Sequence, residues 1–147
     1  MTRESRSSQP PPEFFVDRSL GRYVVADAVR AQGYVVRTMA DVYPDGEDEQ
    51  VSDVRWIADA DRNGWVVLTK DERITRHADE QDALLKSSLR VFAIGNQGLT
   101  GPVMAGYYTT NINRIVRKSR KPGPFVEVVQ RDRVERRWPP PSSGTDA

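Results

Sequence analysis

The segment WVVLTKDERI, residues 65–74, changes abruptly from apolar to charged. Its first four residues favour a buried β-strand, and the residues from Thr69 to Arg73 are polar or charged. A strand that simply ends at the protein surface would explain the change. A metal ion bound by Asp71 at the end of that strand would explain it as well. The choice between the two depends on the rest of the chain.

Strand-like apolar runs and segments with helical spacing alternate along the chain. Besides the strand at 65–69, strands are predicted at 14–16, 34–39, 90–95 and 125–129, the last turning back into 134–138. Helices are predicted between them, at 20–29, 53–63, 83–89 and 102–120, with Ser52 and Thr100 as candidate N-caps and Gly33 and Gly64 as stop signals. This alternation predicts an α/β fold of three layers, a central, mainly parallel β-sheet flanked by helices.

The composition indicates one soluble domain. The chain has 147 residues, of which 37% are hydrophobic and 29% charged, and this length suffices for a single core. The ends at 1–12 and 139–147 are rich in proline and serine and are predicted to be disordered tails around a domain at 13–138. No apolar run has the length of a membrane span and no export leader is visible. Because cysteine is absent, a reducing, cytoplasmic location is expected.

The same composition limits the chemistry. With no cysteine and one histidine, thiolate sites and multi-histidine zinc sites are excluded, so a bound metal would be a hard ion such as Mg²⁺ or Mn²⁺ held by carboxylates. Neither a G-x-S-x-G elbow nor a P-loop is present. The net charge of +1 conceals two poles: eight acids against one arginine at 41–61, and nine bases against three acids at 112–138. This distribution suggests an acidic pocket beside a basic surface.

Three aspartates are expected at one edge of the sheet. Asp17 follows the strand at 14–16, Asp71 lies two residues beyond the strand at 65–69, and Asp53 opens the helix that leads into that strand. Ligands of parallel sheets bind at the edge formed by the strands' carboxyl ends. Carboxylates that converge there resist ionising together unless a cation joins them. Simpler roles are a cap for Asp17, a favourable helix start for Asp53 and a strand end for Asp71.

Three segments resemble a known family: FFVDRSLG (14–21), the run from YPDGEDEQ to KDERI (43–74), and RVFAIGNQGLTG (90–101). They are similar to the PIN-like domain family related to VapC-type toxins, over most of 13–138. The resemblance implies a PIN fold and Mg²⁺- or Mn²⁺-dependent cleavage of single-stranded RNA by the toxin of a toxin–antitoxin pair. It places Asp17, Asp53 and Asp71 at the positions of metal-binding, catalytic acids. RNA and a cognate antitoxin are the implied partners, and a homodimer is a possibility because PIN relatives are often dimers.

The chain departs from the family pattern in two ways. Arg73 stands where many PIN nucleases carry a further acid, and the acid usually supplied by a mid-chain helix has no clear equivalent. Glu47, Asp48 or Glu49 of the acidic loop are candidates for that role. One metal ion is therefore favoured over two. The alternative is a catalytically weak or inert PIN-like module that binds RNA or a partner protein.

Several polar residues close to the same edge are candidates for binding the substrate. They could contact phosphates, or orient a water molecule, and they are Arg18, Lys70, Arg73, Arg76, Asn96 and Thr100. Charge balance beside clustered acids and ordinary loop or capping roles are the competing explanations. A second basic cluster at 114–121 exceeds what a helix end needs and could bind RNA or an acidic antitoxin segment. Trp56 shares a helical face with Asp53, and core packing is its favoured role.

Overall fold

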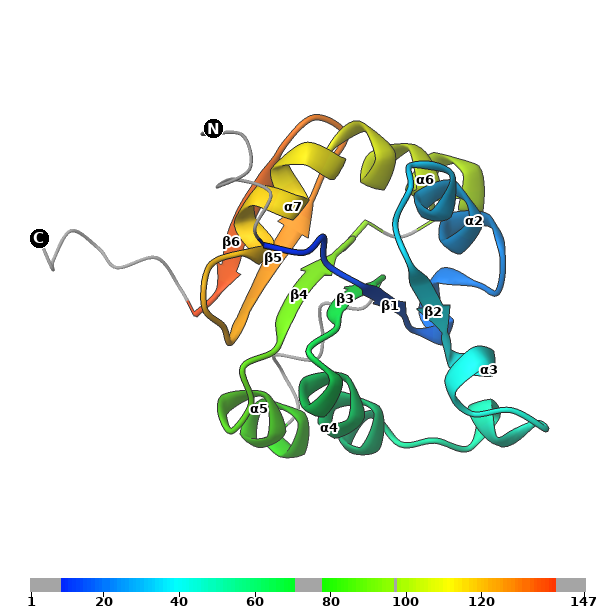
Figure 1. Ribbon diagram of the computed structural model, residues 1–147, viewed down its shortest axis with the longest axis vertical. Helices are drawn as coiled ribbons and strands as arrows, with labels where there is room; N and C mark the ends of the chain where they lie inside the picture. The colour runs from blue at the N-terminus through cyan, green and yellow to red at the C-terminus, as the bar shows by residue number, and fades with distance from the viewer. Residues whose placement is uncertain (1–8, 71–77, 97, 140–147) are drawn as a thin grey trace, which may run out of the picture.

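A six-stranded sheet forms the centre of the fold (Figure 1). The computed structural model describes residues 9–70, 78–96 and 98–139. The strand order is β2-β1-β3-β4-β5-β6; the first five of these strands are parallel, and β6 runs antiparallel to β5. The strands are β1 (Phe14–Val16), β2 (Val36–Thr38), β3 (Val66–Thr69), β4 (Arg90–Ala93), β5 (Phe125–Val129) and β6 (Val134–Trp138). The predicted mainly parallel α/β sheet is confirmed.

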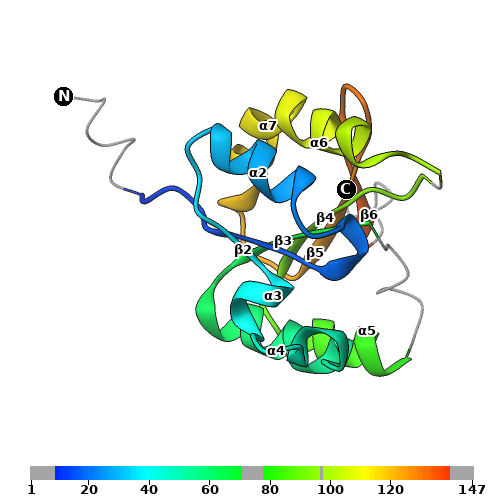
Figure 2. The ribbon, with the colours of Figure 1, turned by 90° about the vertical axis from the view of Figure 1, so that its right-hand side faces the viewer.

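Helices cover both faces of the sheet, which gives the three predicted layers (Figure 2). One face carries α2 (Val24–Ala31), α6 (Gly101–Thr110) and α7 (Ile112–Ser119). The other carries α3 (Met39–Val42), α4 (Asp53–Asn63) and α5 (Ala78–Leu85). Two short 3₁₀ helices, η1 (Arg18–Leu20) and η2 (Glu47–Glu49), lie in the connections. Each face of the sheet has its own cluster of buried apolar side chains, as expected for strands buried on both sides.

The predicted helix caps are present. Ser52 accepts a hydrogen bond from the backbone N–H of Arg55 (3.1 Å) at the start of α4, and Thr100 accepts one from Val103 (3.4 Å) at the start of α6. Gly64 ends α4 at φ 69°, a left-handed conformation that favours glycine. These local signals set the limits of α4, whose first residue, Asp53, is thereby placed at the edge formed by the carboxyl ends of the strands.

The predicted strand at 34–39 is too long, because a helix begins inside it. β2 ends at Thr38, and Thr38 is the N-cap of α3. Its Oγ1 accepts a hydrogen bond from the backbone N–H of Asp41 (3.2 Å), while the Asp41 carboxylate accepts one from the Thr38 N–H (2.9 Å). This reciprocal capping box satisfies two backbone donors and stops the strand.

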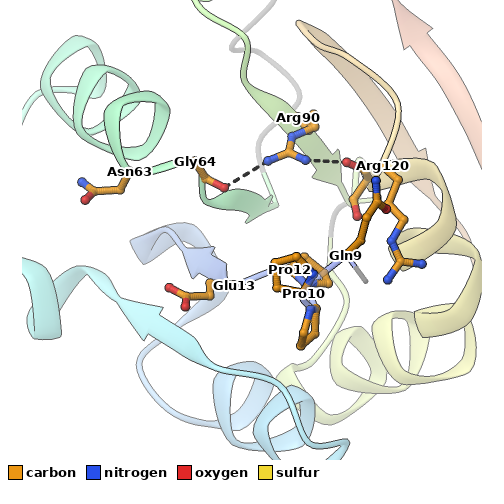
Figure 3. Close-up of a pocket in the computed structure, with 10 residues that line it drawn as sticks. Gln9, Pro10, Pro12, Glu13, Asn63, Gly64, Arg90 and Arg120 are labelled. Atoms are coloured by element: carbon orange, nitrogen blue, oxygen red, sulfur yellow. Dashed lines mark hydrogen bonds between the residues drawn. The ribbon is translucent and has the colours of Figure 1, made fainter. Parts of the chain in front are cut away.

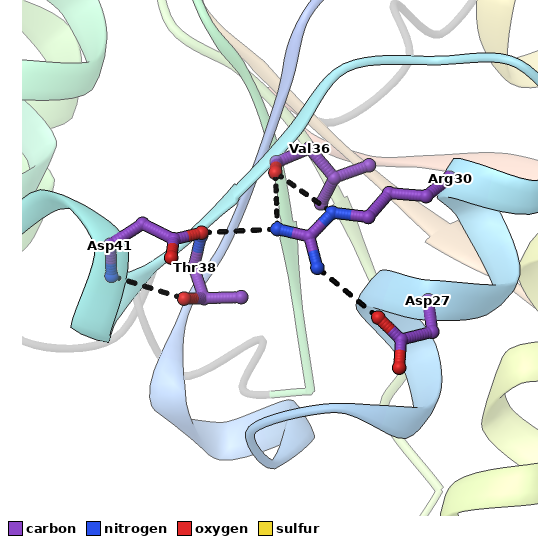
Figure 4. Close-up of polar contacts among 5 residues, drawn as sticks. All are labelled: Asp27, Arg30, Val36, Thr38 and Asp41. Carbon is purple, nitrogen blue, oxygen red and sulfur yellow. Dashed lines mark hydrogen bonds and ion pairs between the residues drawn. The ribbon is translucent and has the colours of Figure 1, made fainter.

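One arginine joins α2, β2 and α3 (Figure 4). The Arg30 guanidinium donates to the backbone carbonyl of Val36 (2.7 Å and 3.2 Å) and forms ion pairs with Asp27 (3.1 Å) and Asp41 (3.0 Å). Arg30 lies in the last turn of α2, where a positive charge is favourable. It thus fixes the edge strand β2 to helices on both faces of the sheet.

The long helix predicted at 102–120 is two helices with a break at Asn111. Asn111 is fully buried, and its side-chain amide donates to the carbonyls of Tyr107 (2.8 Å), Gln130 (2.8 Å) and Arg131 (3.3 Å). The Asn111 amide ties the junction of α6 and α7 to the turn between β5 and β6. Long-range contacts of this kind leave no periodic signal in the sequence.

Not every apolar residue of the helices predicted at 20–29 and 83–89 faces the core. Val24 is 47% exposed and Leu85 is 62% exposed, whereas the neighbouring positions of α2 and α5 face the core. Leu89, predicted within a helix, lies in the link to β4, where the hydroxyl oxygen of Ser87 accepts a hydrogen bond from the Leu89 backbone N–H (3.0 Å). Helices of eight residues carry too few apolar positions to fix their orientation from sequence.

The ends of the chain are only partly covered by the structure. Residues 1–8 and 140–147, which make up most of the two predicted tails, lie outside the described residues. The prediction of disordered tails around a domain at 13–138 therefore stays a prediction. No helix in the described part of the chain is long and apolar enough to cross a membrane.

Candidate active site

Asp17 occupies a buried position at the carboxyl end of β1. Its side chain is held by three short hydrogen bonds: Oδ1 accepts from the backbone N–H and the hydroxyl of Ser19 (both 2.6 Å), and Oδ2 accepts from the hydroxyl of Thr69 at the end of β3 (2.6 Å). Asp17 is also the N-cap of η1, so its predicted capping role is confirmed. The cap and the neighbouring strand together fix this carboxylate at the edge predicted for ligand binding.

The electrostatic surroundings of Asp17 do not favour its charge. Burial, the largest effect, raises the pKa of the Asp17 carboxyl; hydrogen bonds from Ser19 and Thr69 lower it in part, and the nearby charge of Asp53 raises it again. Among the described residues, no lysine or arginine forms an ion pair with Asp17 or Asp53. The charge of Asp53 therefore acts on Asp17, and neither carboxylate has a basic partner among the described residues.

Asp53 is the first residue of α4, and its side chain is exposed. Its Oδ1 accepts a hydrogen bond from the indole N–H of Trp56 (2.8 Å), while Oδ2 has no hydrogen-bond partner among the described residues. The Trp56 ring is buried and packs on Phe15, so its predicted core role is confirmed. The ring also binds the candidate acid directly, which sequence reasoning missed.

Both aspartates keep oxygen lone pairs that no hydrogen bond uses, and these lone pairs fit a hard divalent cation. A carboxylate offers about four lone-pair positions, and Asp17 uses three of them, leaving one on Oδ2. Asp53 uses one. Two carboxylates without a described basic partner, one of them buried, are the oxygen ligands that Mg²⁺ and Mn²⁺ prefer. Within 9–70, 78–96 and 98–139, no group of three histidine, aspartate or glutamate side chains that could hold a metal ion occurs.

Asp71, the third predicted acid, lies outside the described residues, as do Arg73 and Arg76. The residues just before that segment lie at the same edge of the sheet as Asp17. Thr69, the last residue of β3, holds Asp17, and the backbone N–H of Lys70 donates to the Ser19 hydroxyl (2.9 Å). The roles predicted for Asp71, Arg73 and Arg76 stay predictions.

Comparison with known proteins identifies the family of the chain. A family model described as "PIN like domain" matches residues 12–96, which is more than half of the chain. The chain belongs to the PIN-like domain family. It is also similar to a Mycobacterium tuberculosis (strain ATCC 25618 / H37Rv) protein named "Putative ribonuclease VapC45", with 34% identity over 122 residues, covering 83% of this chain and 88% of the relative. No solved structure matches. The predicted family and fold class are confirmed.

In this PIN-like domain, the acidic loop packs against the site through arginines. The Arg18 guanidinium donates to the backbone carbonyls of Asp48 and Val51, so the described structure uses it to hold the loop. Arg22 lies 3.5 Å from the Asp48 carboxylate and 3.8 Å from that of Glu49. Asp48 is buried and Glu47 is exposed. No contact of these loop acids with Asp17 or Asp53 is present in the described structure, and their role as a fourth acid stays a prediction.

Asn96 and Thr100 lie beyond the end of β4, on the same side of the sheet as Asp17. Both are exposed, and Thr100 uses its oxygen to cap α6, which leaves its hydroxyl proton available to a ligand. Lys70 is half-buried beside Ser19. The described contacts give Arg18 and Thr100 structural roles, and the substrate-binding roles of all four residues stay predictions.

Tyr108 of α6 also supports the site, from the core of the protein. Tyr108 is fully buried, and its hydroxyl lies within hydrogen-bonding distance of the carbonyl oxygens of Phe92 (2.8 Å) and Thr69 (3.1 Å). Burial raises the pKa of Tyr108, and so does the charge of Asp17, so the phenol stays protonated. It fixes the end of β3 where Thr69 meets Asp17. The tyrosine lies far away in the sequence, and no local signal marks it.

The basic cluster at 114–121 lies at the opposite edge of the sheet, away from the acids. Two adjoining pockets, of about 440 Å³ and 320 Å³, occur there and share Gly64, Arg90 and Arg120. Figure 3 shows the larger of the two. The Arg90 guanidinium donates to the carbonyls of Ser119 and Gly64, at the carboxyl ends of α7 and α4. Helix ends of this polarity attract positive charge. The cluster is therefore separate from the candidate active site.

Proposed function

We propose that this PIN-like protein is a divalent-metal-dependent endoribonuclease that cleaves single-stranded RNA, and that it acts as the toxin of a toxin–antitoxin pair. Membership of the PIN-like family supports the nuclease class, and the relative named "Putative ribonuclease VapC45" supports RNA as the substrate. A cognate antitoxin as partner and a cytoplasmic location are part of the same proposal.

The buried Asp17 carboxylate beside Asp53 is the observation that carries the proposal. A buried acid with a raised pKa and a second acid nearby destabilises a fold unless a cation neutralises both. Such an arrangement is expected at functional sites rather than in purely structural ones. Its position at the carboxyl ends of β1 and β3 is where ligands bind to parallel sheets.

Each described residue has a distinct role in the proposed reaction. Asp17 and Asp53, with Asp71, would hold Mg²⁺ or Mn²⁺, which when bound polarises a phosphate and lowers the pKa of a water ligand. Ser19 and Thr69 keep the Asp17 carboxylate in one orientation. Burial of Asp17 strengthens its electrostatic effect on the site.

Substrate binding is assigned to residues around that edge. Among the described residues, Lys70 is a candidate for a phosphate contact. It is half-buried, its backbone lies beside Ser19, which holds Asp17, and it forms no ion pair with a described residue. Arg18, Arg73 and Arg76 would add positive charge, and Asn96 and Thr100 would orient the backbone or a water molecule. Most of these contacts would go to phosphates, so binding should weaken with added salt.

The direct test is cleavage of a panel of mixed single-stranded RNAs with Mn²⁺ or with EDTA. The unaltered protein should cut only with the metal, and Asp17→Asn, Asp53→Asn and Asp71→Asn should each lose most of this activity. Asp132→Asn, at an exposed position in the turn between β5 and β6, is the matched control and should cut normally. Metal-independent RNA binding without cleavage would instead support an inert PIN-like module.

A further inference from the structure

The indole N–H of Trp56 donates a hydrogen bond to one oxygen of Asp53, at 2.8 Å. We propose that Trp56 is a positioning residue for the metal site: it fixes the Asp53 carboxylate so that its other oxygen is presented to a divalent cation. The inference rests on the proposed function, because it takes Asp53 as a metal ligand. The two residues are three positions apart in α4 and therefore share a helical face.

The Trp56 ring is held firmly from the core side. It is 3% exposed and lies 5.6 Å from the ring of Phe15 in β1. Phe15 in turn stacks on Trp65, with centroids 5.6 Å apart and planes within 10°, and the Arg37 guanidinium lies 5.1 Å from the Trp65 ring. A close-packed stack of large rings leaves the indole little freedom to rotate. The N–H that reaches Asp53 therefore has a fixed position.

Asp53 gains its order from that bond. It lies in the exposed first turn of α4, where an unrestrained aspartate samples several rotamers. Among the described residues, the Asp53 side chain accepts a hydrogen bond from Trp56 alone, and this bond engages only Oδ1. Groups that bind the far side of a metal ligand in this way orient it, and their loss commonly reduces metal affinity by about 10- to 100-fold.

The hydrogen bond can also be explained by the needs of Trp56 instead of those of Asp53. A buried indole N–H needs an acceptor, so Asp53 could be present only to satisfy Trp56. The two explanations agree on the stability of the protein and differ on metal binding. If Asp53 serves only the indole, replacing Trp56 by phenylalanine leaves the affinity for the metal unchanged.

The test measures Mn²⁺ affinity by calorimetry for Trp56→Phe and for Trp65→Phe, each checked for folding by circular dichroism. Trp65 belongs to the same stack and is also buried, but no hydrogen bond from its indole to Asp17 or Asp53 occurs among the described residues. Trp56→Phe should weaken Mn²⁺ binding about tenfold or more, and Trp65→Phe should change it less than twofold. Equal effects of the two substitutions would overturn the inference.

Two further measurements separate this inference from the proposed function. In an Asp53→Asn background, Trp56→Phe should cause no additional loss of Mn²⁺ affinity; a further tenfold loss would mean that the ring acts through packing, against the inference.

In the unaltered protein, which has three tryptophans, substoichiometric Mn²⁺ should broaden the Trp56 indole N–H signal first in nuclear magnetic resonance spectra. If Trp65 or Trp138 broadens first, Trp56 is not next to the metal. If no Mn²⁺ binds at all, the metal site itself is wrong and the inference fails with it.

Discussion

Replacing Asp17 by asparagine should stabilise the metal-free protein. The amide keeps the local geometry, because its oxygen can accept from the Ser19 N–H and its nitrogen can donate to the Thr69 hydroxyl. What disappears is a buried negative charge that lies near Asp53 and has no described basic partner. Removing such a charge while keeping hydrogen bonds should be worth on the order of 1 to 2 kcal/mol. For a domain of this size that corresponds to a rise in Tm of about 2 to 8 °C.

The pH dependence of this gain follows from the direction of the pKa shift. Because burial raises the pKa of Asp17 above its ordinary value of 3.8, the folded protein retains a proton that the unfolded chain has already released. The carboxylate therefore destabilises the fold increasingly as the pH rises from 3.8 through the raised pKa. The advantage of asparagine should be complete well above that pKa and should vanish as the pH falls towards 3.8.

Divalent cations should reverse the ranking. At a free Mn²⁺ concentration 100 times the dissociation constant, binding adds about 2.7 kcal/mol to the unaltered protein, or about 5 to 11 °C in Tm. Asp17→Asn should gain little. Thermal unfolding followed by circular dichroism, with EDTA or with Mn²⁺, measures both effects. A clear fall in Tm for metal-free Asp17→Asn would show that the acid is structural and would refute the reasoning about the site.

Three other substitutions test separate parts of the structure. Lys70→Ala should weaken RNA binding and reduce the slope of log affinity against log salt concentration by about one; an unchanged slope would remove Lys70 from the RNA contacts. Arg18→Ala should cost about 1 to 3 kcal/mol in urea unfolding, because it frees the buried Asp48 segment that Arg18 holds; no loss would mean that the loop is held by other contacts. Gly123→Ala should destabilise by about 3 kcal/mol or more, because its Cβ would lie 2.5 Å from the carbonyl oxygen of Ser88; a stability within about 0.5 kcal/mol of the unaltered protein would contradict that close approach.

The sequence alone determined the layers of the fold and the edge of the sheet where Asp17 lies. Apolar runs of strand length separated by helices require a parallel sheet, and short local signals such as Ser52 and Gly64 set the limits of α4. Once the strands are parallel, the position of Asp17 after β1 follows from geometry alone. Membership of the PIN-like family, expected from the segments at 14–21, 43–74 and 90–101, is confirmed by the match over 12–96.

Only the tertiary structure decided how the site is held together. The break at Asn111 and the contact of Tyr108 with the end of β3 both depend on groups distant in the chain. The bond from Trp56 to Asp53 joins near neighbours, but its geometry is set by stacking on Phe15 of another element. Periodicity reports which face of an element is apolar. It carries no information on which buried donor meets which acceptor, because that depends on packing between elements.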